Sequence, residues 1–226
     1  MQLINKGKTK DVYKLDSGNL LLVFKDDVTG NDGVFDPGAN KVGLKIEGAG
    51  NAGLRITKFF FEAFKRRGIP THYINANLEN NTMEVLEAEQ YGDGIECICR
   101  YKAVGSFYRR FRKYVEEGKD LDGFVEITIK DDEAGDPPIS KSALLMLEVL
   151  TEKEYNDIVK YTREISDVIR EILASKGLEL YDIKLEFGKD KAGNLMLIDE
   201  VSGGNMRVYK GEECVTPLEL PELLLV

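Results

Sequence analysis

Three charged side chains, those of Asp182, Lys184 and Glu186, alternate with apolar residues in one short stretch of the chain. This period of two is typical of a half-buried strand, and it places the three charges on one face. A turn-forming run and a second apolar run follow over residues 189–198, so a β-hairpin is predicted. Asp199 comes directly after the second strand. If the strands pair, two or three carboxylates and one ammonium group lie close together, which suits a divalent cation that bridges phosphate oxygens.

Near the start of the chain, Lys8 and Lys10 follow Gly7 in a polar loop. The loop leads into two predicted strands, 11–15 and 20–25, so the lysines stand at the mouth of a hairpin. Backbone N–H groups and ammonium groups in such a loop could both face a polyphosphate. The alternative is that the lysines only keep the edge of a sheet soluble.

The segment 100–113 is the most basic part of the chain. Its arginine side chains can form paired hydrogen bonds with phosphate oxygens, and Ser106, which follows a glycine, adds a hydroxyl group. These groups match the needs of a phosphate monoester. A solvated basic helix is the alternative. The interleaved aromatic residues are compatible with RNA, but the acidic character of the whole chain argues against that partner.

Composition narrows the class of protein. Of the 226 residues, 42% are hydrophobic and 31% are charged, and the formal net charge of -9 disfavours nucleic acid as the main partner. The three cysteines show no zinc-binding pattern and are predicted to be buried thiols in a reducing compartment. His72, the single histidine, is predicted to be structural or on the surface rather than catalytic. Because no leader pattern or membrane-spanning run is evident, a cytoplasmic protein without a membrane partner is expected.

Helical and strand patterns are mixed along the chain, which predicts an α+β protein. Apolar residues at helical spacing over 54–64 predict one helix, which Gly68 ends. A longer helix is predicted to begin at the capping box of Thr151 and Glu154 and to end near Gly177. Further strands are predicted in 72–77, 82–87, 95–101 and 124–130.

A loop with two glycines, 90–94, is predicted to separate two domains. The predicted domains are a β-rich nucleotide-binding domain, 1–92, and an α+β domain, 93–226, that carries the metal and substrate site. The short apolar tail 217–226 is expected to dock on the body of the protein or on another subunit.

Six motifs in chain order resemble those of the SAICAR synthetase family, the phosphoribosylaminoimidazole-succinocarboxamide synthetases of purine biosynthesis. The motifs are Gly7-Lys8-x-Lys10, Asp26-Asp27-x-Thr29-x-x-Asp32-Gly33, Gly68-Ile69-Pro70-Thr71-His72, Arg100 with Ala103-x-Gly105-Ser106, Lys130-Asp131-Asp132 with Asp136-Pro137, and the pair Asp182-Ile183-Lys184-Leu185-Glu186-Phe187-Gly188 and Asp199-Glu200-Val201-Ser202. Each motif alone is weak evidence, but their order along nearly the whole chain is specific.

The resemblance implies an ATP-dependent ligase with two small-molecule substrates besides ATP. The carboxylate of carboxyaminoimidazole ribonucleotide (CAIR) would be activated as an acyl phosphate, and the amine of L-aspartate would then displace phosphate to form an amide. The implied fold has a β-rich N-terminal domain and a larger α+β domain with the ATP cleft between them, similar to ATP-grasp enzymes and kinases. A homodimer is the implied assembly.

The resemblance also implies residue roles on the ATP side of the site. Lys8 and Lys10 would meet the phosphates of ATP. Glu186 and Asp199 would hold Mg²⁺, with Glu186 also near the ribose. Lys130 would lie on the nucleotide side and belong to the catalytic group.

On the substrate side, the resemblance implies that Arg100, Ser106 and Arg207 grip the 5′-phosphate of CAIR. Asp182 and Lys184 would face the imidazole part of that nucleotide, close to the reacting atoms, and are therefore predicted to be catalytic as well as substrate-binding residues.

Two departures from the family pattern fall near the predicted second-substrate site. The family usually has an aspartate at the position of Gly204, and a lysine at the position of Ala49, between Gly48 and Gly50. Two alternatives therefore stay open. One is a paralogous ATP-dependent amide ligase with a different amine or carboxylate, and the other is a nucleotide-binding module that has lost the ligation reaction.

Overall fold

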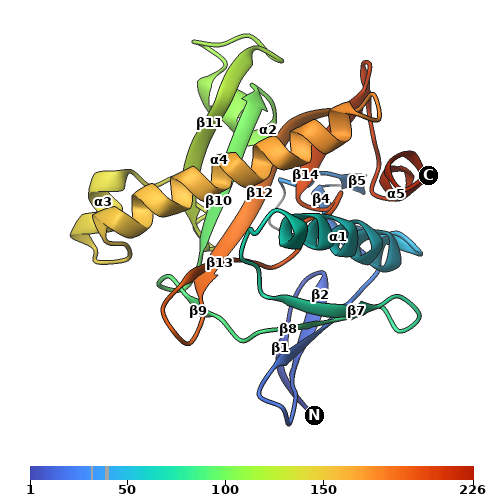
Figure 1. Cartoon of the computed structure of the whole chain (residues 1–226). Coiled ribbons are helices and arrows are strands. Elements are labelled where there is room, and N and C mark those ends of the chain that lie inside the picture. The colour runs from blue at the N-terminus through green and yellow to red at the C-terminus, as the bar shows by residue number, and fades with distance from the viewer. Residues whose placement is uncertain (32, 39–40) are drawn as a thin grey trace. The chain divides into compact units, whose positions relative to one another are not determined.

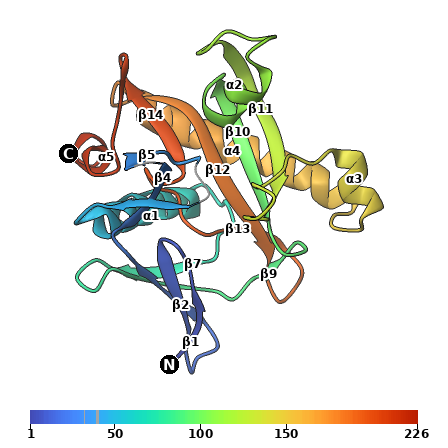
Figure 2. The ribbon, with the colours of Figure 1, turned by 180° about the vertical axis from the view of Figure 1, so that it is seen from behind.

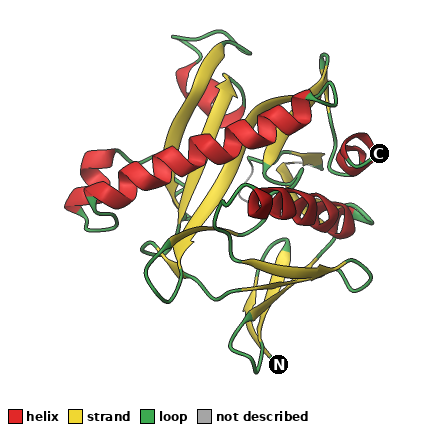
Figure 3. Cartoon of the chain, viewed as in Figure 1, coloured by secondary structure: helices red, strands yellow, loops and turns green. Residues whose placement is uncertain are grey.

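The computed structural model describes residues 1–31, 33–38 and 41–226, so Asp32 of the second motif lies outside the described residues. Helices and strands are mixed throughout, which gives the predicted α+β class (Figure 3). The chain forms two compact units. The first unit contains Met1–Glu89, Gly188–Asn205 and Val215–Val226, and the second contains Gln90–Phe187 and Met206–Cys214. Each unit is described by itself below.

The compact units differ from the predicted domains in one respect. The prediction cut the chain once, into 1–92 and 93–226, and the first boundary between the units lies near that cut, after Glu89. Two later segments, 188–205 and 215–226, belong to the first unit. Their boundaries lie within or directly beside strands, where the hydrophobic pattern shows no break. The nucleotide-binding role of residues 1–92 stays a prediction.

An antiparallel five-stranded sheet forms much of the first unit. Its strands, in spatial order, are β1 (Gln2–Lys6), β2 (Lys10–Lys14), β3 (Leu20–Phe24), β8 (Thr82–Val85) and β7 (Tyr73–Asn77). Alternate residues of its central strands point into the core, where Leu22, Phe24, Met83 and Val85 are buried. The hairpin predicted behind the lysine loop is confirmed as β2 and β3.

A small sheet and two helices complete most of the first unit. The sheet contains β4 (Asp27–Asn31), β5 (Val34–Phe35) and β6 (Val42–Lys45). The first helix, α1 (Ala49–Arg66), packs on β3 and β7, and its Phe60, Phe61 and Phe64 are fully buried. The predicted helix is therefore confirmed, although it begins at Ala49, before the apolar pattern that starts at Leu54.

The C-terminal tail docks within the first unit. It contains a short helix, α5 (Glu219–Leu224), that packs on α1, and Arg55 of α1 forms a 2.9 Å ion pair with Glu222. Leu220 and Leu224 are buried there. The tail was expected to dock on the body of the protein or on another subunit, and in the structure it docks on the body.

A second sheet forms the centre of the second unit. Its strands, in spatial order, are β11 (Asp120–Ile129), β10 (Ile95–Lys102), β12 (Glu179–Lys189), β14 (Met206–Lys210) and β15 (Glu213–Cys214). Two further strands, β9 (Glu89–Gln90) and β13 (Leu195–Ile198), also pair with β12, so the predicted hairpin of β12 and β13 is confirmed.

The long helix α4 (Glu152–Ala174) crosses this sheet, as Figures 1 and 2 show from opposite sides. Its predicted capping box is present: Thr151 accepts from the Glu154 N–H, and the Glu154 carboxylate accepts from the Thr151 N–H. The buried Ile158, Ile165 and Ile169 lie on one face of the helix. The two other helices of this unit are α2 (Gly105–Phe111) and α3 (Lys141–Met146).

The cysteines differ in their environments. Cys97 and Cys99 of β10 are buried, as predicted, and burial raises the pKa of both thiols. Cys214 of β15 is exposed, so the prediction of a buried thiol is wrong there. This strand has only two residues and lies at the edge of the sheet, where one side has no covering strand. Among the described residues, no helix is long and apolar enough to cross a membrane.

Candidate active site

The ammonium group of Lys10 lies between two carboxylates of the first unit. Its Nζ is 2.9 Å from Asp199 Oδ1 and also donates to Glu200, and the side chain is 11% exposed. Burial alone would lower the pKa of Lys10, but Asp199 and Glu200 together raise this pKa well above its usual value. Lys10 is therefore a fixed positive charge, and the structure brings it together with Asp199.

Asp199 adopts a left-handed backbone conformation, with φ of 63°, which is uncommon for a residue other than glycine. His72 holds this turn, because its Nε2 donates to the backbone carbonyl of Asp199 at 2.9 Å. The imidazole is buried against the ring of Phe61, and burial lowers the pKa of His72 to about 4. The neutral ring is structural, as predicted, and it fixes the backbone of a predicted metal ligand.

Hydrogen bonds fix the lysine loop that precedes β2. The Gly7 N–H donates to the Lys10 carbonyl at 2.9 Å, and Lys25 Nζ donates to the Gly7 carbonyl at 2.7 Å. A Cβ atom on Gly7 would lie 2.5 Å from the Lys10 carbonyl oxygen, so only glycine fits this close approach. The side chain of Lys8 is exposed, and Lys8 lies two residues before the first paired residue of β2, at the mouth of the hairpin as predicted.

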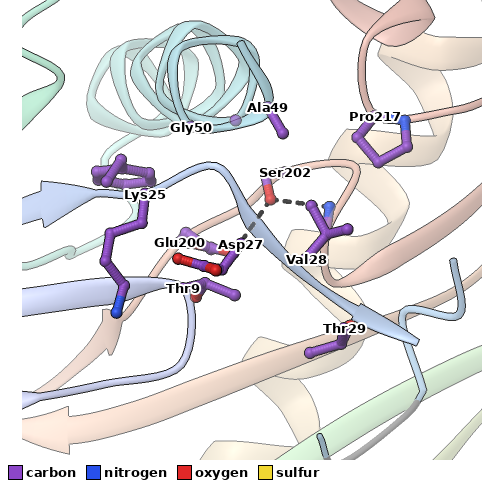
Figure 4. A pocket seen from close by; sticks show the side chains of 13 residues that line it. Thr9, Lys25, Asp27, Val28, Thr29, Ala49, Gly50, Glu200, Ser202 and Pro217 are labelled. Carbon is purple, nitrogen blue, oxygen red and sulfur yellow. Dashed lines mark hydrogen bonds between the residues drawn. The ribbon is translucent and has the colours of Figure 1, made fainter. Parts of the chain in front are cut away.

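A small pocket of about 40 Å³ lies in the first unit, between the start of α1 and the segment that follows β13 (Figure 4). Lys25, Asp27 and Glu200 are the charged residues in its wall. Ser202 Oγ accepts from the Gly204 N–H at 3.0 Å and donates to Glu200 Oε1 at 3.2 Å. Charged and hydrogen-bonding groups therefore line a space large enough for a small polar group.

A network of charged side chains crosses the sheet of the second unit. The antiparallel register places Arg100 of β10 opposite Asp182 of β12, and Asp182 opposite Arg207 of β14. Asp182 accepts from Arg100 at 3.1 Å and from Arg207 at 2.7 Å. Arg100 also donates to Ser106 Oγ at 3.1 Å. The structure thus brings together four of the predicted substrate-binding residues. Arg100, Ser106 and Arg207 were predicted to bind the 5′-phosphate, and Asp182 was predicted to face the imidazole part.

Two lysine-carboxylate pairs lie farther along the same sheet. Lys130 Nζ lies 3.0 Å and 2.9 Å from the two carboxylate oxygens of Glu186, and Lys184 Nζ donates to Glu96 at 2.6 Å. Thr128 donates to the other oxygen of Glu96. The predicted residues Lys130 and Glu186 are therefore in direct contact, whereas Lys184 has a partner that was not predicted.

Two of the three charged side chains of β12 are buried and the third, Lys184, is 31% exposed, so the strand is more buried than predicted. Asp182 is 3% exposed and Glu186 is 6% exposed. Ion pairs with Arg100, Arg207 and Lys130 make this burial possible, because an unpaired charge would lose its hydration without compensation.

Glu186 and Asp199, the predicted Mg²⁺ ligands, belong to different units. Within the described residues, no cluster of three or more histidine, cysteine or carboxylate side chains could hold a metal ion. The metal site stays a prediction.

Sequence reasoning missed two charged residues of these networks, Glu96 and Glu126, and it did not single out Arg110 from the basic segment 100–113. Glu126 Oε2 accepts from Arg100 Nη2 at 2.8 Å, and its other oxygen accepts from Arg110. A usable signal was present, since Glu96 lies between Ile95 and Cys97, and Glu126 lies between Val125 and Ile127, so each carboxylate stands among apolar neighbours. Such residues need a partner when they are buried.

The family model for SAICAR synthetase matches residues 3–217 of the chain. The chain belongs to the SAICAR synthetase family. A phosphoribosylaminoimidazole-succinocarboxamide synthase of Clostridium tetani is 57% identical over 226 residues, which is 100% of both chains. The corresponding synthase of Methanocaldococcus jannaschii is 34% identical over 212 residues, covering 93% of this chain and 83% of that protein.

A solved SAICAR synthetase in complex with ADP has the same fold. It superimposes with a TM-score of 0.83 at 29% sequence identity and covers 96% of this chain and 88% of its own. The α+β SAICAR synthetase fold implied by the sequence motifs is therefore confirmed. The arginine network of the second unit and the Lys10 cluster of the first unit are two candidate functional sites, each within its own unit.

Proposed function

We propose that this protein joins L-aspartate to the carboxylate of CAIR in an ATP-dependent reaction that forms SAICAR, ADP and phosphate. The observation that carries the proposal is the 57% identity with the Clostridium tetani synthase over the full length of both chains. A 29% identical SAICAR synthetase in complex with ADP supports ATP as the phosphoryl donor. The arginine network supports a phosphorylated nucleotide as a substrate.

The proposed reaction has two steps. A carboxylate oxygen of CAIR attacks the γ-phosphorus of ATP, the bond between that phosphorus and the β–γ bridging oxygen breaks, and ADP leaves. The amine nitrogen of L-aspartate then attacks the acyl carbon, and phosphate leaves with one oxygen of the original carboxylate. A nearby carboxylate can take the proton that the amine loses. No side chain has to form a covalent intermediate, so positioning and charge neutralisation supply the catalysis.

On the ATP side, Lys8 and Lys10 are the proposed ligands of the phosphates, and Lys130 is proposed to be a catalytic residue on the nucleotide side. The position of Lys10 supports this role, because Asp199 and Glu200 hold its mostly buried ammonium group in place. On the substrate side, Asp182 and Lys184 are proposed to face the imidazole part of CAIR.

Glu186 and Asp199 are the proposed ligands of Mg²⁺, and their chemistry fits this ion. Mg²⁺ commonly takes one or two protein carboxylates and completes its shell with water and substrate phosphates, so a larger protein cluster is not needed. Each carboxylate already neutralises a lysine, Lys130 for Glu186 and Lys10 for Asp199. When bound, Mg²⁺ would neutralise phosphate oxygens of ATP.

A ligase with a different acceptor amine is the second candidate, and the pocket of the first unit favours it. Ala49 and Gly204 both line this pocket. The family pattern has a lysine and an aspartate at these two positions, so the pocket lacks one charge of each sign. A change in the charged groups of a polar pocket is a way to alter which small molecule it accepts.

Phosphate release from ATP in the presence of CAIR tests both candidates. We expect release with L-aspartate and at most a background rate with L-asparagine, L-glutamate or β-alanine. A higher kcat/KM for another amine would support the second candidate instead. No release with any amine, together with calorimetric binding of ATP, would reject both and support a non-catalytic nucleotide-binding module.

A homodimer and a cytoplasmic location are part of the same proposal. The proposed substrates are small and charged, and two of them, ATP and CAIR, carry phosphate, which favours an enzyme that works where these metabolites are made. Light scattering of the purified protein gives its mass in solution, and a mass equal to one chain would reject the dimer.

A further inference from the structure

Arg110, in the last turn of α2, belongs to the charge network of the second unit but has no part in the function proposed above. Its Nη2 donates to Glu126 Oε1, while Glu126 Oε2 holds Arg100. The network contains the guanidinium groups of Arg100, Arg110 and Arg207 and the carboxylates of Glu126 and Asp182. Among these five described groups the positive charges outnumber the negative charges by one, which suits the binding of an anion.

Arg100 has little capacity left for such an anion. A guanidinium group has five N–H donors. The Nε–H donates to Glu126, the two Nη2 hydrogens go to Glu126 and Ser106, and one Nη1 hydrogen goes to Asp182. One donor remains, and the side chain is 2% exposed. Arg100 therefore orients its neighbours, and this positioning role replaces the direct contact with the 5′-phosphate that the family resemblance implied for it.

Arg110 is in the opposite situation. Its side chain is 31% exposed, and within the described part of the chain its ion-pair partner is Glu126. Most of its five donors are consequently available to a ligand. The guanidinium group also lies 5.5 Å from the ring centre of Phe111, which limits its movement.

Ser106 connects Arg110 to the predicted phosphate site. Arg100 Nη2 contacts both Ser106 Oγ and Glu126 Oε2, and the other oxygen of Glu126 contacts Arg110. Because Ser106 Oγ accepts from Arg100, its own hydroxyl hydrogen can donate to an anion. Hydrogen bonds thus connect Arg110 to Ser106 through the carboxylate of Glu126 and the guanidinium group of Arg100.

We propose that Arg110 binds the 5′-phosphate of the nucleotide substrate and that Glu126 and Arg100 are positioning residues for this contact. The inference rests on the proposed function, because it names a further ligand of the same substrate. A phosphate dianion presents three terminal oxygens, and a planar guanidinium can contact two of them at once. Glu126 holds the Arg110 fork in place and does not contact the substrate.

Calorimetric binding of CAIR and of the corresponding ribonucleoside, without ATP, tests this inference. The comparison uses wild type, Arg110→Gln and Arg112→Gln, the last being a matched control because Arg112 is an exposed arginine two residues away. We expect Arg110→Gln to raise the Kd of CAIR by about tenfold, the usual effect of losing a charge-assisted hydrogen bond. The Kd of the ribonucleoside, which has no phosphate, should not change, and Arg112→Gln should bind both ligands as wild type does.

Two results would overturn the inference. One is an unchanged Kd of CAIR in Arg110→Gln, and the other is an equal rise for CAIR and the ribonucleoside, which would indicate a general structural effect. Arg110→Lys keeps the charge but loses the fork, so it should bind CAIR with an intermediate Kd. Since binding is measured without turnover, a wild-type protein that binds CAIR but forms no SAICAR would reject the proposed function and leave the Arg110 contact intact.

Discussion

Single residues decide where the guanidinium group of Arg207 can lie. Gly105 has a φ of 56°, and a Cβ atom built on it would lie 2.7 Å from Arg207 Nη2 and 2.8 Å from its Cζ. The absent side chain therefore leaves room for the guanidinium that holds Asp182. At Asp199, the hydrogen bond from His72 to the backbone carbonyl stabilises the left-handed conformation, in which φ is 63°.

Gly105→Ala is expected to weaken nucleotide binding as well as stability. A side chain at positive φ costs about 1 kcal/mol in the free energy of unfolding. Gly118→Ala is the matched control, because Gly118 has a φ of 77° and a Cβ atom added to it would meet nothing within 4 Å. Urea unfolding should show a loss in both variants, the larger one in Gly105→Ala because the guanidinium of Arg207 must shift, and only Gly105→Ala should raise the Kd of CAIR, by about tenfold. Equal CAIR binding by the two variants would contradict the role of Gly105.

His72 is expected to make the protein less stable below neutral pH. Its pKa is about 4 in the folded protein and 6.5 in the unfolded chain, so the unfolded chain binds more protons between these values. The stabilising contribution is complete above pH 6.5 and is lost as the pH falls towards 4. From pH 7.5 to pH 5 the loss is about 2 kcal/mol.

Urea unfolding of wild type and His72→Gln, in EDTA to remove divalent cations, measures this contribution. The glutamine can still donate to the Asp199 carbonyl but does not titrate. The wild type should lose about 2 kcal/mol more than the variant between the two pH values. The same pH dependence in both proteins would mean that the imidazole titrates normally in the folded state.

At the scale of secondary structure, the pairing of β12 with two neighbours assembles the arginine network. The register with β10 on one side and β14 on the other puts Asp182 between Arg100 and Arg207. A shift of one residue would turn all these side chains to the opposite face of the sheet. In the first unit, β2 and β3 have a comparable role, because Lys25 directly follows β3 and bonds to the loop before β2.

Lys25→Met is expected to loosen the lysine loop and weaken ATP binding. The substitution removes the hydrogen bond from Nζ to the Gly7 carbonyl and the ion pair with Asp11 at 3.3 Å. We expect the KM for ATP to rise about fivefold to tenfold with little change in the KM for CAIR. Lys14→Met, which removes an ion pair with Glu87 at the other end of β2, is the control and should leave both constants unchanged. An unchanged KM for ATP in Lys25→Met would show that the loop does not need this anchor.

At the scale of the whole chain, local patterns predicted the elements better than their partners. The capping box and apolar spacing predicted α4, and alternation predicted β12, because both signals depend on residues that are near in sequence. The pairing of β10 with β12 joins segments about 80 residues apart, so Arg100 and Asp182 gave no local sign of contact. For the same reason, the return of 188–205 and 215–226 to the first unit was not predicted.

Charge is also distributed unevenly over the chain. The protein has a net charge of -9, yet the arginine network of the second unit carries a net positive charge. A local positive centre in an acidic protein favours a small anion over a nucleic acid, whose many phosphates would meet the surrounding carboxylates. A local positive charge in an acidic protein therefore agrees with a mononucleotide as the substrate.

The most direct test of the proposed reaction is mass spectrometry of a mixture containing the protein, ATP, Mg²⁺, L-aspartate and CAIR labelled with ¹⁸O in its carboxylate. We expect SAICAR that has lost one labelled oxygen, together with phosphate that has gained it, and neither product when L-aspartate is left out. Release of unlabelled phosphate, or no SAICAR in the complete mixture, would contradict the proposed reaction.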